Sequence, residues 1–259
     1  MRLRTVGLML GAGLLAAAPA WADRWDNTTS QDDTASTTFN ELHHGVVQDH
    51  DWSGDTDQDW YRFSTRGRSS YEVVVDGLGS DLNTIYIDFE RYVYSDTTTV
   101  LDYFTTAGTG YQLSLRWQNT NSSSQSDRIK IAATNTGNST NDGYVVKAYE
   151  TRVAIPRYNN SGGQITVLLC QNLGDSTNTG SVYLWSAAGS LVTNFNYSVA
   201  ANGLLAQNLA SVNSGAANNT SGTVTVTQSG RFGDLNCKSV ALEPATGFSF
   251  DSPGVYKPL

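Results

Sequence analysis

Apolar and polar residues alternate along most of this 259-residue chain, and the alternation restarts after each of many short polar segments. A period of two is typical of β-strands with one buried face, and no segment shows the 3.6-residue period of an amphipathic helix. In the first half, the apolar rows are Tyr61 and Phe63; Tyr71, Val73 and Val75; Ile85, Ile87 and Phe89; Tyr111, Leu113, Leu115 and Trp117; Ile129 and Ile131; Tyr144, Val146 and Ala148.

The second half repeats the pattern after a strong turn signal at residues 159–163, whose sequence is Asn-Asn-Ser-Gly-Gly. Many short strands separated by Asn/Ser/Gly-rich loops predict an all-β protein with two antiparallel β-sandwich domains, jelly-roll or Ig-like, in tandem. We place these domains at residues 37–150 and 151–259, and a polar surface loop at residues 119–127. The apolar rows of the second half are Ile165, Val167 and Leu169; Val182 and Leu184; Phe195, Tyr197 and Val199; Leu204 and Leu205; Val224 and Val226; Val240 and Leu242.

The N-terminal residues have the features of an export signal. Arg2 and Arg4 precede an apolar run that is too short to span a membrane, and Ala20-Trp21-Ala22 provides a small-x-small cleavage site. Residues 1–22 are therefore predicted to be a signal peptide, and the polar residues 23–36 a flexible leader. The mature protein is expected in the bacterial periplasm or outside the cell, without a membrane span.

Net charge limits the classes of partner, and the cysteines predict a crosslink. The formal net charge of −8 argues against nucleic acid and anionic membranes as partners. Cys170 and Cys237 are the only cysteines, and in an oxidising compartment a single pair is expected to form a disulfide. Two buried free thiols remain the alternative. A disulfide that closes a loop of this length stabilises a fold by roughly 4 kcal/mol in the chain-entropy model.

An acidic stretch at residues 49–57 holds the candidate metal ligands. Oxygen-bearing residues at alternate positions, with Gly54 at the sixth position, resemble the first half of an EF-hand calcium loop. The twelfth position is Trp60 instead of Glu, and a strand follows, so an EF-hand is excluded. A structural Ca²⁺ site completed by a distant carboxylate remains open, as does a solvated acidic turn whose aspartates cap backbone N–H groups. The candidate ligands are Asp49, Asp51, Ser53, Asp55 and Asp57.

A candidate ligand-binding row follows from the parity of residues 86–94. If Ile87 and Phe89 face the core, the even positions form an outward row of three tyrosines and two carboxylates. Aromatic faces stack on sugar rings or on partner side chains, and carboxylates accept hydrogen bonds from hydroxyl groups. The alternative is that tyrosine simply favours half-buried strand surfaces. The row consists of Tyr86, Asp88, Glu90, Tyr92 and Tyr94.

No catalytic residues can be assigned from the sequence. His43 and His44 are adjacent, so on a strand their rings point to opposite faces, and neither H-E-x-x-H nor G-x-S-x-G occurs. We expect these two histidines and His50 to lie at the surface.

Residues 54–63, Gly-Asp-Thr-Asp-Gln-Asp-Trp-Tyr-Arg-Phe, resemble the G-D-x-D-W-Y-R-F signature of the bacterial pre-peptidase C-terminal (PPC) domain. The next predicted strand, residues 71–75, and the closing one, residues 144–149, also suit that family, so the resemblance covers about residues 37–150. It implies a jelly-roll-like, non-catalytic module that accompanies secreted hydrolases. The C-terminal half resembles uncharacterised β modules of exported bacterial proteins.

Together these features predict an exported, non-catalytic binding, adhesion or accessory protein. Its expected ligand is a polysaccharide or a cell-surface protein. Two alternatives remain: a secreted hydrolase whose site has no recognisable motif, and a structural subunit of an assembly.

Overall fold

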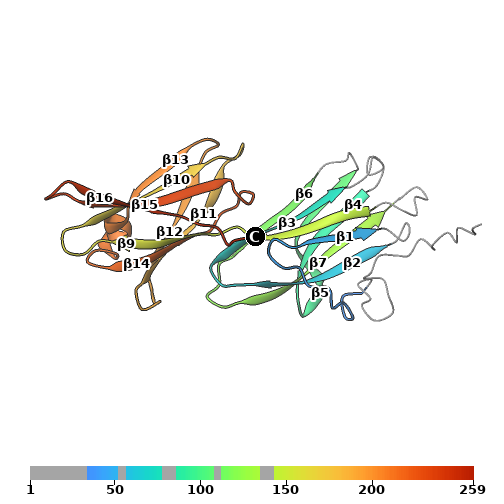
Figure 1. Ribbon diagram of the computed structural model, residues 1–259. Helices are drawn as coiled ribbons and strands as arrows, with labels where there is room; N and C mark the ends of the chain where they lie inside the picture. The colour runs from blue at the N-terminus through green and yellow to red at the C-terminus, as the bar shows by residue number, and fades with distance from the viewer. Residues whose placement is uncertain (1–33, 52–56, 78–85, 108–111, 135–142) are drawn as a thin grey trace, which may run out of the picture.

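The computed structural model describes residues 34–51, 57–77, 86–107, 112–134 and 143–259, and this part of the chain is built almost entirely of strands (Figure 1). Every strand pairing in the four sheets is antiparallel, which confirms the predicted all-β class and its two β-sandwiches. Within the described residues, no helix has the length and apolar character required to cross a membrane.

The first sandwich is formed by eight strands whose order is that of a jelly roll. One sheet has the order β1-β8-β3-β6 and the other β2-β7-β4-β5, so consecutive strands pass from sheet to sheet except for β4 and β5, which are neighbours in one sheet. The strands are β1 (Val47–Asp51), β2 (Gln58–Thr65), β3 (Ser69–Gly77), β4 (Tyr86–Val93), β5 (Asp96–Ala107), β6 (Leu113–Asn119), β7 (Gln125–Thr134) and β8 (Gly143–Glu150).

Except for Ile85 and Tyr111, which lie outside the described residues, the apolar rows predicted for the first half form the core of this sandwich. Tyr61, Val73, Phe89 and Ile131 are almost completely buried and come from four different strands. Because side chains alternate between the faces of a strand, each row is brought to the inner face of its sheet. The predicted loop at residues 119–127 is shorter than expected, since β6 continues to Asn119 and β7 begins at Gln125.

The second sandwich has a different strand order. Its sheets are β13-β10-β15-β16 and β12-β11-β14-β9. Its core is a separate cluster, so the two cores divide between Ala148 and Val153. The elements are β9 (Val153–Asn159), β10 (Ile165–Asn172), β11 (Asn178–Ser186), β12 (Leu191–Val199), β13 (Leu204–Asn208), the short 3-10 segment η2 (Leu209–Gly215), β14 (Ser221–Val226), β15 (Leu235–Glu243) and β16 (Phe248–Pro253).

In β10 the buried face is not the apolar row that the sequence displays. Thr166, Leu168 and Cys170 are buried, whereas Ile165, Val167 and Leu169 share the other face and are half-buried. The neighbouring strand β15 behaves in the same way. The core face is determined by where the second sheet packs and by the disulfide, not by hydropathy alone.

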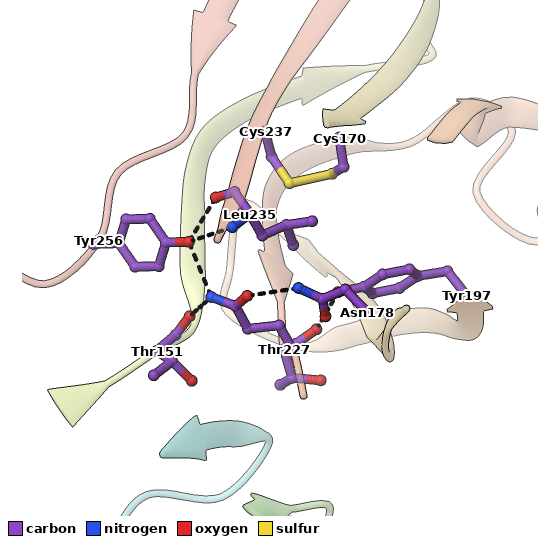
Figure 2. Close-up of a disulfide and its surroundings, with 9 residues drawn as sticks. Thr151, Cys170, Asn178, Tyr197, Thr227, Leu235, Cys237 and Tyr256 are labelled. Atoms are coloured by element: carbon purple, nitrogen blue, oxygen red, sulfur yellow. Dashed lines mark hydrogen bonds between the residues drawn. A yellow bond between two sulfur atoms is a disulfide. The ribbon is translucent and has the colours of Figure 1, made fainter. Parts of the chain in front are cut away.

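Cys170 and Cys237 lie directly opposite each other on β10 and β15 and form a disulfide inside the second sandwich (Figure 2). Both residues are buried, with exposed fractions of 0% and 2%. The predicted pairing is thus confirmed, and the alternative of two free thiols is wrong. A disulfide is typical of proteins outside the reducing cytoplasm, which agrees with the predicted export.

The two sandwiches lie end to end (Figure 1), and one buried glutamine, Gln228, links them at the junction. The backbone N–H of Gln228 donates to Oγ of Ser70 in the first domain at 3.1 Å. Its side-chain Nε2 donates to the Thr151 carbonyl at 2.8 Å and to the Tyr256 hydroxyl at 2.9 Å, and its Oε1 accepts from Asn178 at 2.9 Å. All polar atoms of this side chain are thereby used in holding the linker and the second domain together, through Thr151, Asn178 and Tyr256, which Figure 2 labels.

An aromatic contact completes the junction. The Phe232 ring, from the loop before β15, stacks on Tyr149 of β8 with centroids 4.8 Å apart and packs against Tyr256 at 4.9 Å. The Phe232 N–H donates to Oε2 of Glu72 at 2.7 Å. The C-terminus also ends at this junction (Figure 1), where Leu259 lies beside Gly45 of the first domain.

Candidate functional site

The predicted calcium ligands lie where β1 ends and β2 begins, around a turn that is only partly described. Asp49 is exposed on β1, and Asp51 is the last residue of that strand. Asp57 is buried, and its Oδ1 accepts a hydrogen bond of 2.9 Å from the backbone N–H of Gln58. Ser53 and Asp55 lie outside the described residues. Among the described residues, no group of three or more His, Cys, Asp or Glu side chains is arranged to hold a metal ion.

Calcium binding at this turn remains a proposal with a direct test. If Asp49, Asp51 and Asp57 share a cation with the residues between them, millimolar Ca²⁺ raises the melting temperature, because a ligand that binds only the folded state stabilises it. The double variant Asp49→Ala/Asp51→Ala should lose this rise. Differential scanning fluorimetry with Ca²⁺ and with EDTA measures it, and identical melting curves in the two conditions would reject the site.

The predicted row on β4 does not form one continuous exposed surface. Tyr92 is only 5% exposed and packs against Trp60, with ring centroids 5.2 Å apart. Its hydroxyl donates to Oε2 of Glu90 at 2.8 Å, and Lys130 donates to the same oxygen at 2.9 Å. Asp88 is half-buried, and the Tyr86 side chain lies outside the described part. Among the members whose side chains are described, Tyr94, just after β4, is the exposed one.

A chain of buried polar side chains crosses the interior of the first sandwich. The Tyr144 hydroxyl donates to Oδ2 of Asp59, so the Tyr61 hydroxyl must donate the 2.5 Å hydrogen bond between the two tyrosines. The His50 ring stacks on Tyr144 at 5.3 Å and meets Tyr61 edge-on at 5.1 Å. Burial is the main cause that raises the pKa of Tyr144 well above its usual value, with the Asp59 carboxylate second. This hydroxyl is therefore neutral at physiological pH and acts as a structural hydrogen-bond donor.

The histidine prediction is correct only for His43, which is exposed. His50 is 3% exposed because it shares the inward face of β1 with Gln48, and its Nε2 lies 3.2 Å from Oε1 of the equally buried Gln48. His44 is half-buried at the junction between the domains.

A groove of about 540 Å³ lies at the end of the first sandwich. We call it the Tyr94 groove. It lies between the β4–β5 turn on one side and the end of β6 with the following loop on the other, and Gln118 on its wall also binds Thr227 of the second domain at 2.8 Å. The lining residues are Arg91, Val93, Tyr94, Ser95, Leu101, Trp117, Gln118, Asn119, Thr120, Asn121, Gln125, Ser126 and Asp127.

The floor of the groove is an arginine held between an aromatic ring and two carboxylates. The Arg91 guanidinium lies 5.0 Å from the centroid of Trp117. Its Nε donates to Oδ2 of Asp102 at 2.8 Å, and one terminal nitrogen donates to Oδ2 of Asp127 at 3.1 Å. These contacts come from three strands, β4, β5 and β7, and from the β6 ring, so the sandwich itself orients the guanidinium.

Burial is the largest influence on the pKa of Asp127, the buried carboxylate in the floor of the groove. Burial raises this pKa, while the positive charge of Arg91 and its hydrogen bond oppose the rise. The side chain of Asp127 is 4% exposed, and that of Asp102 is 38% exposed at the rim. Two carboxylates beside one guanidinium leave the groove without an excess of positive charge.

The mouth of the groove combines apolar and amide side chains. Tyr94 and Leu101 are exposed by 36% and 40%, and the Arg128 guanidinium lies 4.4 Å from the centre of the Tyr94 ring. Asn119 fixes the facing loop, because its side chain donates to the carbonyls of Arg66 and Ser123 at 3.0 and 3.1 Å. A rigid wall carrying amides, an accessible ring and a shielded ion pair can bind a hydroxyl-rich ligand by stacking and hydrogen bonds.

Sequence reasoning found one residue of this groove and missed the others. Tyr94 belongs to the predicted row, whereas the sequence predicts a core row for Trp117 and a surface loop for residues 119–127. Both assignments hold in part, because Trp117 is buried beneath Arg91 and the loop forms a wall. The available signal was an amide-rich loop directly after an aromatic strand end.

No family model and no curated protein matches this chain. Among solved structures, the PPC domain of a collagenase from Bacillus anthracis is similar, with a TM-score of 0.32 and 13% identity over 42% of this chain and 92% of that one. A fucolectin from striped bass serum has a TM-score of 0.23 and 7% identity over 82% and 87% of the two chains. An M60 catalytic domain with two CBM51 domains from Clostridium perfringens has a TM-score of 0.25 and 8% identity over 90% and 38%.

These TM-scores are too low to transfer a function. The chain is similar to the PPC domain both in the sequence motif of its first half and in this structural match over 42% of its length.

Proposed function

We propose that this chain is an extracytoplasmic, non-catalytic binding protein that holds a neutral polysaccharide in the Tyr94 groove. The observation that carries the proposal is the groove itself, about 540 Å³ in volume, with an accessible tyrosine at its mouth and amide side chains along one wall. Aromatic rings with a few fixed polar groups are suited to sugars, which present apolar ring faces between hydroxyl groups.

The charge of the groove supports a neutral glycan over an acidic one. The single guanidinium on its floor is already paired with Asp102 and Asp127. An acidic sugar would therefore find the charge of Arg91 already neutralised, in a protein whose formal net charge is −8, and the Arg128 guanidinium at the mouth lies against the Tyr94 ring.

The interior of the first sandwich supports a scaffold role. Tyr144 donates to Asp59, Glu150 binds Arg152 at 2.7 Å, and Glu72 accepts from Ser114 and from the Phe232 N–H. These ionisable groups stabilise strands and the domain junction, which supports a scaffold that presents the groove.

Affinity gel electrophoresis with a panel of neutral and acidic soluble polysaccharides tests the proposal. The wild-type protein should be retarded by at least one neutral polymer, and Tyr94→Ala should weaken this binding about tenfold, equivalent to about 1.4 kcal/mol of lost stacking. Tyr103→Ala is the matched control, since Tyr103 is 72% exposed on β5 and does not line the groove. Retardation by no neutral polymer, or equal behaviour of the two variants, would reject the function.

A further inference from the structure

His44 joins the first domain to the C-terminal residues through both of its ring nitrogens. Nδ1 lies 2.8 Å from the backbone nitrogen of Glu150, which can only donate, so Nδ1 carries no proton and accepts this bond. Nε2 lies 3.0 Å from the carbonyl oxygen of Lys257, so Nε2 carries the proton and donates. The geometry therefore defines one neutral tautomer.

The same ring packs against the aromatic contact of the junction. The centroid of the His44 ring lies 5.7 Å from that of Phe232, which belongs to the second domain, and 6.0 Å from that of Tyr149. His44 also lines a cavity of about 260 Å³ together with Lys257 and Glu150. A change in the orientation of the His44 ring therefore alters its contacts with both the C-terminal segment and the Phe232 loop.

We propose that His44 is a pH-sensitive clasp that holds residues 257–259 on the first domain when it is neutral and releases them when it is protonated. Protonation places a hydrogen on Nδ1, directly facing the N–H of Glu150 at a nitrogen–nitrogen distance of 2.8 Å. Two donors cannot share that contact, so the ring must turn away, and turning breaks the bond from Nε2 to the Lys257 carbonyl.

The surrounding charges agree with a neutral ring in the clasped state. Burial is the largest cause that lowers the pKa of His44 below its usual 6.5, and the ammonium of Lys257 lowers it further. The carboxylate of Glu150 and the carbonyls of Lys257 and Pro258 act in the opposite direction. The effect of Glu150 is moderated because Arg152 at 2.7 Å and Ser69 at 2.8 Å already bind its carboxylate.

Other charged groups of the elements around His44 have partners of their own or lie at the cavity rim. In the Phe232 loop, Asp234 accepts from the backbone N–H of Arg231 at 2.6 Å. Arg66 and Glu41 line the cavity from the first domain, and Leu259 lies beside Gly45.

The direction of the pH effect follows from the lowered pKa. The released ring binds a proton more readily than the clasped ring, so the clasp is complete above the ordinary pKa of 6.5 and weakens as the pH falls below it. The equilibrium shifts toward release by at most tenfold for each pH unit between the two pKa values. The Ala154–Val255 bridge and the bonds of Tyr256 keep the preceding residues on the second domain, so release is confined to residues 257–259.

NMR on the full ¹⁵N-labelled chain between pH 8 and 5 tests the clasp. We expect the amides of Lys257 and Leu259 to gain disordered-like heteronuclear NOE values on acidification, with the midpoint of the His44 imidazole titration, which must lie below 6.5. The variant His44→Gln can accept from Glu150 and donate to Lys257 without titrating, so its tail should stay ordered throughout. The control His43→Gln alters the exposed neighbour and should behave as wild type.

An ordered wild-type tail at pH 5, or the same release in His44→Gln as in wild type, would overturn the proposal. If the glutamine variant has a mobile tail at every pH, the wild-type titration decides: a tail midpoint that differs from that of the His44 ring would overturn it.

Discussion

Replacing Cys170 and Cys237 together by alanine is expected to lower the free energy of unfolding of the second domain by about 4 kcal/mol in the chain-entropy model. The bond closes a loop with a sequence separation of 67 residues, so its loss restores much conformational freedom to the unfolded chain. The two residues are also directly opposed on β10 and β15, at the centre of a four-stranded sheet.

Urea unfolding followed by hydrogen exchange, read separately for the strands of each domain, measures this effect. Protection should fall in β10, β13 and β15 and remain unchanged in β4 and β7, which belong to the other core. Wild-type protein treated with reductant is the matched control and should reproduce the loss. A decrease below about 1 kcal/mol would show that the chain-entropy account does not apply here.

The variant Tyr144→Phe should lower the stability of the first domain by about 3 kcal/mol, the upper part of the range for a buried group that loses its hydrogen-bond partner. The change removes one oxygen and no ring volume. It takes the donor away from Asp59, which is 1% exposed, and the acceptor away from Tyr61, which is 0% exposed. A buried carboxylate without this donor is costly because water cannot replace it.

Tyr61→Phe is the matched control. It removes the hydroxyl that donates to Tyr144 and leaves the hydrogen bond between Tyr144 and Asp59 in place. Its cost should be about 1 kcal/mol, the usual net value of one neutral hydrogen bond. Chemical denaturation of both variants compares the two costs. Equal costs would mean that the carboxylate of Asp59 does not depend on Tyr144.

The candidate site shows where sequence reasoning ends. Arg91 and Trp117 are separated by more than twenty residues in the sequence, yet the guanidinium lies over the ring because β4 and β6 belong to facing sheets. Alternation indicates that each residue points to one of two faces. It does not indicate which strands face each other, so the Tyr94 groove could not be assembled from the pattern.

The inward-facing polar residues of β1 give a second example. Gln48 and His50 are buried while Val47 is 52% exposed, the reverse of what hydropathy predicts. This reversal is tolerated because Gln48 donates to the Glu41 carbonyl at 2.9 Å and His50 packs on two tyrosine rings. The two tyrosines come from β2 and β8, and only the folded chain brings them to β1.

Period-two alternation by itself determined that this chain is an all-β protein of two sandwiches, because a strand alternates its side chains whatever its neighbours are. The presence of two cysteines in a protein predicted to be exported to an oxidising compartment likewise indicated that they pair. Strand order and sheet packing decided the rest: which face of β10 is buried, how Arg91 is held, and why His44 joins two domains. Those properties depend on contacts between segments that are distant in the sequence. Such segments come into contact only when the two sheets of each sandwich pack around their core, and when the two sandwiches meet at the junction.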